Sequence, residues 1–124
     1  MKLGIVGSRR RHSFEDGELI KKKILELKPS MIISGGCYLG ADKFAEDFAR
    51  ELGIPITIFY PKLREGKKYT QEEIREAMYE RNRQIAYESD HLIALVVPDR
   101  KGGTENTIGY FKRHGMGEDD LEIL

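Results

Sequence analysis

The stretch IISGGCYLGADKFAEDFAR, Ile32–Arg50, decides the fold of this chain. An apolar run ends at Ser34, and three glycines follow at Gly35, Gly36 and Gly40. Glycine loses more conformational freedom than any other residue when it is fixed, so three in one turn indicate that other atoms approach this backbone closely. A helix is predicted directly afterwards, because small and apolar residues recur at steps of three and four. These residues are Ala41, Phe44, Ala45, Phe48, Ala49 and Leu52.

Strand and helix patterns alternate on both sides of this stretch. Thr70 and Glu73 form a capping-box signature for the third helix, and Gly53 ends the second. The alternation predicts one doubly wound α/β domain over 1–124, with a mainly parallel sheet of about five strands and helices on both faces. The expected strands are 2–7, 30–34, 54–61, 91–97 and 120–124, and the expected helices are 13–28, 41–52, 71–87 and 105–113. The inward face of the first helix is expected to carry Leu19, Ile20, Ile24 and Leu27.

Composition limits the kinds of function. The 124 residues are 40% hydrophobic and 34% charged, and 21 Lys plus Arg balance 21 Asp plus Glu, giving a net charge of +0. A global basic field for gripping nucleic acid is therefore absent. No long apolar signal region or membrane-spanning stretch is found, which favours a cytoplasmic protein without membrane contact. The many Lys, Glu and Arg residues lean towards a heat-adapted source.

Neither a metal ion nor a cofactor is expected. Cys37 is the single cysteine, so no intrachain disulfide can form. His12, His91 and His114 are scattered and form no metal-ligand spacing with Cys37. The chain lacks a GxGxxG spacing, a Walker A motif and a GxSxG elbow. A standard dinucleotide fold, a P-loop ATPase and a serine hydrolase are thus disfavoured.

Glycine, hydroxyl and charged residues follow the first, second and fourth predicted strands. Ligands of parallel sheets bind beyond the carboxyl ends of the strands, and helix N-termini favour anions, phosphate above all. A tight turn or close helix packing explains any single loop better, but three such loops at one end of the sheet indicate a phosphate site. The candidates are Gly7, Ser8, Arg9, Ser34, Gly35, Gly36, Gly40, Asp42, Gly102, Gly103 and Thr104.

The third helix places polar residues where apolar ones are expected. Its inward stripe runs through Ile74 and Met78, then Arg81 or Asn82, then Ile85. A buried charge is costly unless it is paired. Arg81 either pairs with a core carboxylate such as Asp42, reaches along the surface to water, or points with Asn82 into a ligand crevice, which is the interpretation we favour.

Two carboxylates are candidates for acid/base chemistry. Glu105 lies in the first turn of the last helix, where it either interacts with the helix dipole or acts beside a bound phosphate. Asp42 lies at the start of the second helix and is the other candidate. Tyr38 and Tyr60 flank the loops, where they either stack on a base or are ordinary tyrosines of the kind common at strand ends.

These motifs resemble the SLOG superfamily, and the resemblance covers nearly the whole chain in order. The single-domain, YspA-like branch has the pattern GSR, SGGxxGAD, RN and GT. It matches Gly7–Arg9, Ser34–Asp42, Arg81–Asn82 and Gly103–Thr104 here. The resemblance implies a Rossmann-like fold, binding of nucleotides or nucleotide-derived ligands, and self-association, to which Phe111 and the third-helix surface are expected to contribute.

Two other branches imply different activities. The LOG branch hydrolyses the N-glycosidic bond of nucleoside monophosphates with an arginine and the glutamate of a PGGxGTxxE motif. Here that glutamate position is Thr107, and Glu105 points about 200° away around the helix. The DprA (Smf) branch binds single-stranded DNA through a basic crevice. Such a crevice would use Arg9, Arg10, Arg11, Arg81 and Arg83.

The expected function is binding of a nucleoside monophosphate or an ADP-ribose-like ligand, as a sensor or low-activity enzyme. The phosphate is expected on the Gly35–Gly36 and Gly103–Thr104 loops, with its charge offset by Arg9 and Arg81. Asp42 would hold an arginine or accept from a ribose hydroxyl. LOG-like N-glycosidic hydrolysis and DprA-like binding of single strands stay open as alternatives, the second weakened by the neutral charge.

Overall fold

A computed structural model describes residues 1–115 and 117–124. Its five strands form one sheet in the order β3-β2-β1-β4-β5, with every neighbouring pair parallel. The predicted fold class, a Rossmann-like, doubly wound α/β domain, is confirmed. The elements are β1 (Lys2–Gly7), α1 (Phe14–Leu27), β2 (Met31–Ser34), α2 (Ala41–Leu52), β3 (Ile56–Ile58), α3 (Gln71–Glu88), β4 (His91–Leu95), α4 (Gly103–Arg113), a 3-10 turn (Glu118–Asp120) and β5 (Leu121–Ile123).

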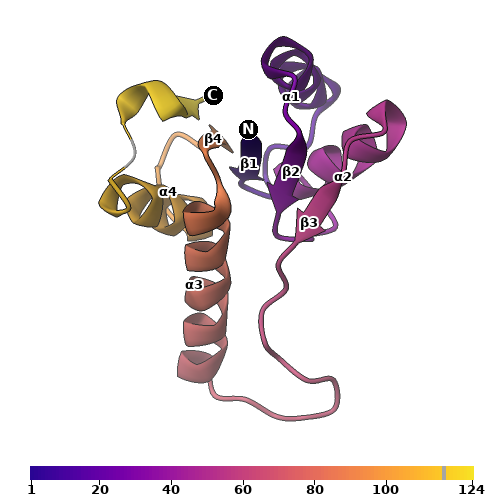
Figure 1. Cartoon of the computed structure of the whole chain (residues 1–124). Helices are drawn as coiled ribbons and strands as arrows, with labels where there is room; N and C mark the ends of the chain where they lie inside the picture. The colour runs from indigo at the N-terminus through magenta and orange to yellow at the C-terminus, as the bar shows by residue number, and fades with distance from the viewer. Residues whose placement is uncertain (116) are drawn as a thin grey trace.

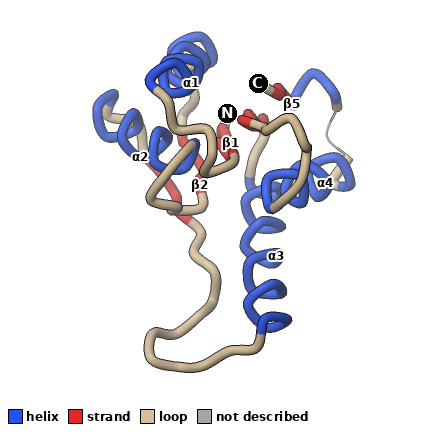
Figure 2. Tube along the Cα trace, turned by 180° about the vertical axis from the view of Figure 1, so that it is seen from behind, coloured by secondary structure: helices blue, strands red, loops and turns tan. Residues whose placement is uncertain are grey.

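The sheet lies between two helical layers, α1 with α2 on one face and α3 with α4 on the other (Figure 1 and Figure 2). Alternate residues of β1 pack against the two helical layers, since successive side chains of a strand point to opposite faces of the sheet. Leu3 and Ile5 pack with Ile20 of α1, whereas Val6 packs with Phe111 of α4. Phe111, which the sequence suggested as an interface residue, is 0% exposed and packs in the core. Because both faces are buried, the central strands read as continuous apolar runs.

The chain changes its winding direction at β1. From β1 it winds outward through β2 to β3, then crosses back to β4 and β5 on the other side. The topological switch point, where ligands of open parallel sheets bind, therefore lies between the carboxyl ends of β1 and β4. Gly7 ends β1 there, and a Cβ on it would lie 2.8 Å from the Cβ atoms of both Ala41 and Leu95. This glycine allows α2 to begin directly against the end of the strand.

Several boundaries and one helix face differ from the sequence-based expectation, and β4, expected over 91–97, ends at Leu95. The third strand is only Ile56–Ile58, because the chain turns away after Phe59 donates its N–H to Ser34. Leu19 of α1 is 39% exposed rather than inward-facing. Gly17 is buried in its place, and a Cβ on Gly17 would lie 2.8 Å from the Phe44 ring. Helix α4 begins at Gly103, two residues earlier than expected.

Helix α3 extends beyond the body of the molecule. Its buried residues, Asn82, Ile85 and Ala86, all lie in its second half. The first half projects from the sheet, and the segment 59–70 runs out beside it before joining its N-terminus (Figure 1). The predicted capping box is confirmed, since Thr70 accepts from the Glu73 N–H and Glu73 accepts from the Thr70 N–H. Within the described residues, no helix is long and apolar enough to cross a membrane.

Candidate functional site

All four helices follow strands of one parallel sheet, so their positive N-terminal ends are on the same side of it, although the start of α3 lies well beyond the sheet (Figure 1). Two of these ends are closed by their own side chains. Ser13 with Asp16 caps α1, and Thr70 with Glu73 caps α3. By contrast, α2 follows Gly40 and α4 follows Gly102, and neither has a side-chain cap. The first N–H groups of α2 and α4 are therefore left for other acceptors.

The three glycines after β2 are each approached by the protein's own atoms. A Cβ on Gly35 would lie 2.8 Å from Arg81 Nη1, and one on Gly36 would lie 2.6 Å from the Tyr60 ring. A Cβ on Gly40 would lie 2.7 Å from the Ser8 carbonyl oxygen. Gly36 and Gly40 also have φ values of 73° and 79°, which disfavour other residues. Close packing of this loop thus explains why it needs glycine.

Arg81 joins this loop to α3. Its Nη1 donates to the carbonyl oxygen of Gly35 at 2.6 Å, and its Nε donates to Asn82 Oδ1 at 3.0 Å. The guanidinium is partly buried, which lowers the pKa of Arg81 below its ordinary value, while the nearby charge of Asp42 favours the protonated form. The side chain therefore faces inward, as expected, but holds a backbone carbonyl and has no direct ion pair within the described residues.

Asn82, the next residue of α3, joins this helix to the start of α4. Its side chain is buried, and its Nδ2 donates to Asn106 Oδ1 at 3.0 Å and to the Gly103 carbonyl oxygen at 3.4 Å. Together with Arg81 it forms one hydrogen-bonded chain from Gly35 to Gly103. The two adjacent residues of α3 thus fix the glycine loops after β2 and β4 relative to each other.

Asp42 is a buried carboxylate inside the loop after β2. Its Oδ2 accepts the Cys37 N–H at 3.1 Å. Burial raises the pKa of Asp42 above its ordinary value, although the Cys37 N–H and the charge of Arg81 oppose the shift. A buried carboxyl group with a raised pKa is a candidate proton donor.

Ser34 carries an unsatisfied hydroxyl at the end of β2. The residue is 0% exposed, and among the described residues its Oγ is the one buried side-chain oxygen or nitrogen without a hydrogen-bond partner. Its hydroxyl lies beside the Asp42 carboxyl group, where hydrogen bonding from Ser34 opposes the rise in the pKa of Asp42, although the two groups do not meet full hydrogen-bond geometry. An unpaired buried hydroxyl is costly, so this position has unused hydrogen-bonding capacity at the base of the loop.

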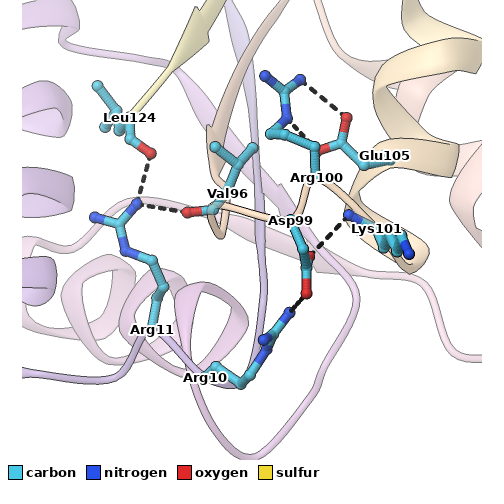
Figure 3. Close-up of polar contacts among 8 residues, drawn as sticks. All are labelled: Arg10, Arg11, Val96, Asp99, Arg100, Lys101, Glu105 and Leu124. Carbon is cyan, nitrogen blue, oxygen red and sulfur yellow. Dashed lines mark hydrogen bonds and ion pairs between the residues drawn. The ribbon is translucent and has the colours of Figure 1, made fainter.

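The two loops at the switch point are tied to each other (Figure 3). Arg10 forms an ion pair with Asp99 at 2.9 Å. Arg11 donates from Nη1 to the carbonyl oxygens of Val96 and Leu124, at 2.9 and 2.6 Å, and also pairs with Asp16. These two arginines hold the loops after β1 and β4 together. Arg9 is exposed and has no ion pair or hydrogen bond from its side chain among residues 1–115 and 117–124.

Glu105 belongs to a separate polar group. Both of its carboxylate oxygens accept from Arg100, at 2.8 and 2.9 Å, in a bidentate pair (Figure 3). Asp42 instead contacts the loop after β2, so no contact joins the two candidate carboxylates in the described structure. Arg100 has a φ of 52°, an uncommon value for a residue other than glycine. The turn before α4 is thus held in a fixed shape by the Arg100–Glu105 pair.

The start of α4 is open. A Cβ on Gly102 would meet no atom within 4 Å, and one on Gly103 would meet only Asn82 Nδ2, at 3.6 Å. Gly102 has a φ of 109°, so the backbone conformation itself requires glycine there. Gly103 has neither a positive φ nor a close neighbour that would require glycine. Of the loops predicted to bind phosphate, the one at Gly102–Thr104 leaves the most room at its backbone.

A cavity of about 350 Å³ lies between the segment 59–70 and α3. Its lining includes Tyr60, which covers Gly36, and Arg81, together with Lys62, Tyr69 and Glu76. Two of its lining residues, Tyr60 and Arg81, also approach the loop after β2. The sequence reasoning missed Lys62, Tyr69 and Glu76. The available signal was the unusual length of the polar connection between the third strand and the third helix.

Comparison with known proteins adds no assignment: no family model matches the chain, and no curated protein matches its sequence at a significant level. Groups of three or more His, Cys, Asp or Glu able to hold a metal ion are also not found among the described residues. The site is therefore defined by its geometry, which is two uncapped helix starts joined through α3.

Replacing Arg81 with Lys tests this connection. Lysine cannot donate to the Gly35 carbonyl and Asn82 in the same fork geometry, so we expect Arg81→Lys to lower the free energy of unfolding by about 1–3 kcal/mol. The matched change Arg83→Lys, on the same helix in an exposed ion pair with Glu80, should cost less than about 0.5 kcal/mol. Urea denaturation measures both, and equal losses would contradict the role of Arg81.

Replacing Asp42 with Asn gives a pH-dependent test. An acid whose folded-state pKa is raised binds more protons when folded, so its contribution to stability falls as pH rises from the ordinary value of 3.8 through the folded pKa. We therefore expect the stability of Asp42→Asn relative to wild type to increase over this interval and then level off. Urea midpoints of both proteins between pH 3 and 8 measure the difference, and a difference that decreases with pH would contradict the raised pKa.

Proposed function

We propose that this protein binds a nucleotide or nucleotide-derived ligand, a nucleoside monophosphate or an ADP-ribose-like molecule, as a sensor or low-activity enzyme. The observation that carries the proposal is the pair of uncapped glycine starts at α2 and α4, held together by Arg81 and Asn82. Free N–H groups and the positive helix ends favour a phosphate at each start. The exposed, unpaired Arg9 on the loop after β1 supplies a positive charge at the same edge.

The spacing of the two starts favours a ligand longer than phosphate. Strands β2 and β4 lie on either side of β1, so their carboxyl ends are about 10 Å apart. A mononucleotide or an ADP-ribose-like molecule extends over such a distance, with its phosphate at α4 and its sugar or second phosphate towards α2. The unpaired Ser34 hydroxyl and Asp42 are then near the sugar. Tyr60 lines the cavity between the segment 59–70 and α3, and its ring offers a surface on which a base can stack.

Gly103 offers a clean test of phosphate binding at α4. Gly103→Asp places a carboxylate at the first helical position, which the helix dipole tolerates but a phosphate would not. We expect this variant to keep the stability of the ligand-free protein and to lose affinity for AMP or ADP-ribose at least about tenfold. Gly103→Ala, which meets Asn82 Nδ2 only at 3.6 Å, is the neutral control and should bind like wild type.

Isothermal titration at fixed salt with AMP, GMP, CMP, UMP and ADP-ribose is the measurement, with thermal shifts of the ligand-free variants as the folding check. Equal affinities of wild type, Gly103→Ala and Gly103→Asp for a ligand that binds would place its phosphate elsewhere. Binding of none of these ligands would reject the proposed ligand class.

N-glycosidic hydrolysis is a second candidate function, and the raised pKa of the buried Asp42 favours it. The pairing of Glu105 with Arg100 makes Asp42 the better proton donor of the two carboxylates. We expect any release of free base from AMP to be lost in Asp42→Asn and retained in Glu105→Gln. Chromatography of the products against a boiled control measures this. Release that survives in Asp42→Asn but not in Glu105→Gln would reverse the assignment.

Binding of single-stranded nucleic acid has less support. Three of the five arginines considered for a basic crevice already have carboxylate partners, which are Asp99 for Arg10, Asp16 for Arg11 and Glu80 for Arg83. Arg81 holds Gly35. Arg9 alone is then available for phosphate, too little for strong backbone binding.

A further inference from the structure

The cavity between the segment 59–70 and α3 is connected to both glycine loops through two adjacent residues. Arg81 lines the cavity and donates to Gly35, and Asn82, the next residue of α3, donates to Gly103. The volume of about 350 Å³ is at the lower end of the range for small-molecule sites. It suits one planar group such as a nucleobase better than a whole nucleotide. Tyr60 is 63% exposed, so the cavity is open to a ligand from solvent.

The two walls of this cavity differ in chemistry. The segment 59–70 contributes the rings of Tyr60 and Tyr69, and the Tyr69 hydroxyl accepts the Arg64 N–H at 2.9 Å. Helix α3 contributes residues spaced by three and four, which share one face of the helix. They are Glu73, Glu76, Ala77, Glu80, Arg81 and Gln84. A flat aromatic ligand can therefore stack on a tyrosine ring and present its polar edge to α3.

Most of the carboxylates in the cavity already have partners. Glu73 accepts the Thr70 N–H, and both carboxylate oxygens of Glu80 accept from Arg83. Glu76 differs, because its carboxylate has no hydrogen bond or ion pair among the residues that the structure describes. The cavity thus contains one carboxylate whose two oxygens are both available to a ligand.

An available carboxylate distinguishes the nucleobases by their edges. It accepts two hydrogen bonds side by side and donates none. Guanine presents two adjacent donors, its ring N–H and its 2-amino group. In adenine and cytosine the amino group is beside a ring nitrogen that only accepts, and in uracil the ring N–H lies between two carbonyl oxygens. Guanine is therefore the base whose edge matches an unpaired carboxylate best.

We propose that this cavity binds the base of the ligand and selects guanine through Glu76, an inference that rests on the nucleotide site proposed above. Glu76 accepts from the two adjacent donors of guanine, and the base stacks on Tyr60. Lys62 lines the same cavity and supplies a donor for the guanine carbonyl oxygen. Gln84 suits any base, because its amide both donates and accepts. Adenine would set an acceptor nitrogen against the carboxylate, which leaves both groups unpaired.

Isothermal titration of the wild-type chain with GMP, IMP and AMP at fixed salt tests the selection. IMP keeps the ring N–H of guanine but lacks the 2-amino group, so the affinities should fall in the order GMP, IMP, AMP. We expect GMP to bind at least about tenfold more tightly than AMP. AMP binding as tightly as GMP would overturn the selection of guanine but leave nucleotide binding in place, whereas binding of none of the three would reject both. IMP binding as tightly as GMP would overturn the two-donor contact.

The variant Glu76→Gln separates the base contact from the phosphate contact. Its amide keeps only one acceptor, so the ratio of GMP to AMP affinity should fall at least about fivefold. The matched control Glu72→Gln removes the same charge at an exposed residue of α3 outside the cavity, and its ratio should equal that of wild type. Gly103→Asp should weaken GMP and AMP by the same factor, since both carry the same phosphate. An unchanged ratio in Glu76→Gln, or an equal fall in Glu72→Gln, would overturn the role of Glu76.

Discussion

The hydrogen-bonded chain from Gly35 through Arg81 and Asn82 to Gly103 is the interaction on which the site depends. It connects the loops after β2 and β4, which lie on opposite sides of the central strand β1. A partly buried guanidinium is costly unless it is satisfied, and the Arg81 side chain also fixes the backbone around it. Since both loops are held by neighbouring residues of α3, a ligand that contacts both meets a preorganised spacing and loses less free energy to ordering.

The all-parallel sheet explains why the glycines at the starts of α2 and α4 matter. It places four helix N-termini on one side of the sheet, and the chain caps two of them with its own side chains. The glycines after β2 are required for packing, because Arg81, Tyr60 and Ser8 approach their backbone. Gly102 and Gly103 at the start of α4 have open space around them, although the φ of Gly102 itself favours glycine. The glycine-rich loops therefore have two different physical origins. The number of glycines does not by itself support a phosphate site, and the open backbone at the start of α4 supports one better than the packed loop after β2 does.

Sequence patterns predicted what depends on local periodicity and missed what depends on distant partners. The alternation of strands and helices, the Thr70–Glu73 capping box and the inward position of Arg81 and Asn82 follow from spacing alone. The inward face of α1 was partly wrong, because a small residue at Gly17 packs against the Phe44 ring and Leu19 stays outside. Whether Glu105 interacted with the helix dipole or acted beside a bound phosphate was left open, and its ion pair with Arg100 was not predicted. The answer lay in the left-handed turn at Arg100, which no periodicity encodes.

The most direct test of the central claim is an amide-resolved NMR titration with AMP and with ADP-ribose. If the loops after β2 and β4 form one site, the N–H signals of Gly40–Asp42 and of Gly103–Glu105 should shift together and give the same dissociation constant. Signals of the capped helix starts, at Ser13 and Thr70, should change little. Shifts confined to one of the two loops, or two different dissociation constants, would contradict a single site held together by Arg81 and Asn82.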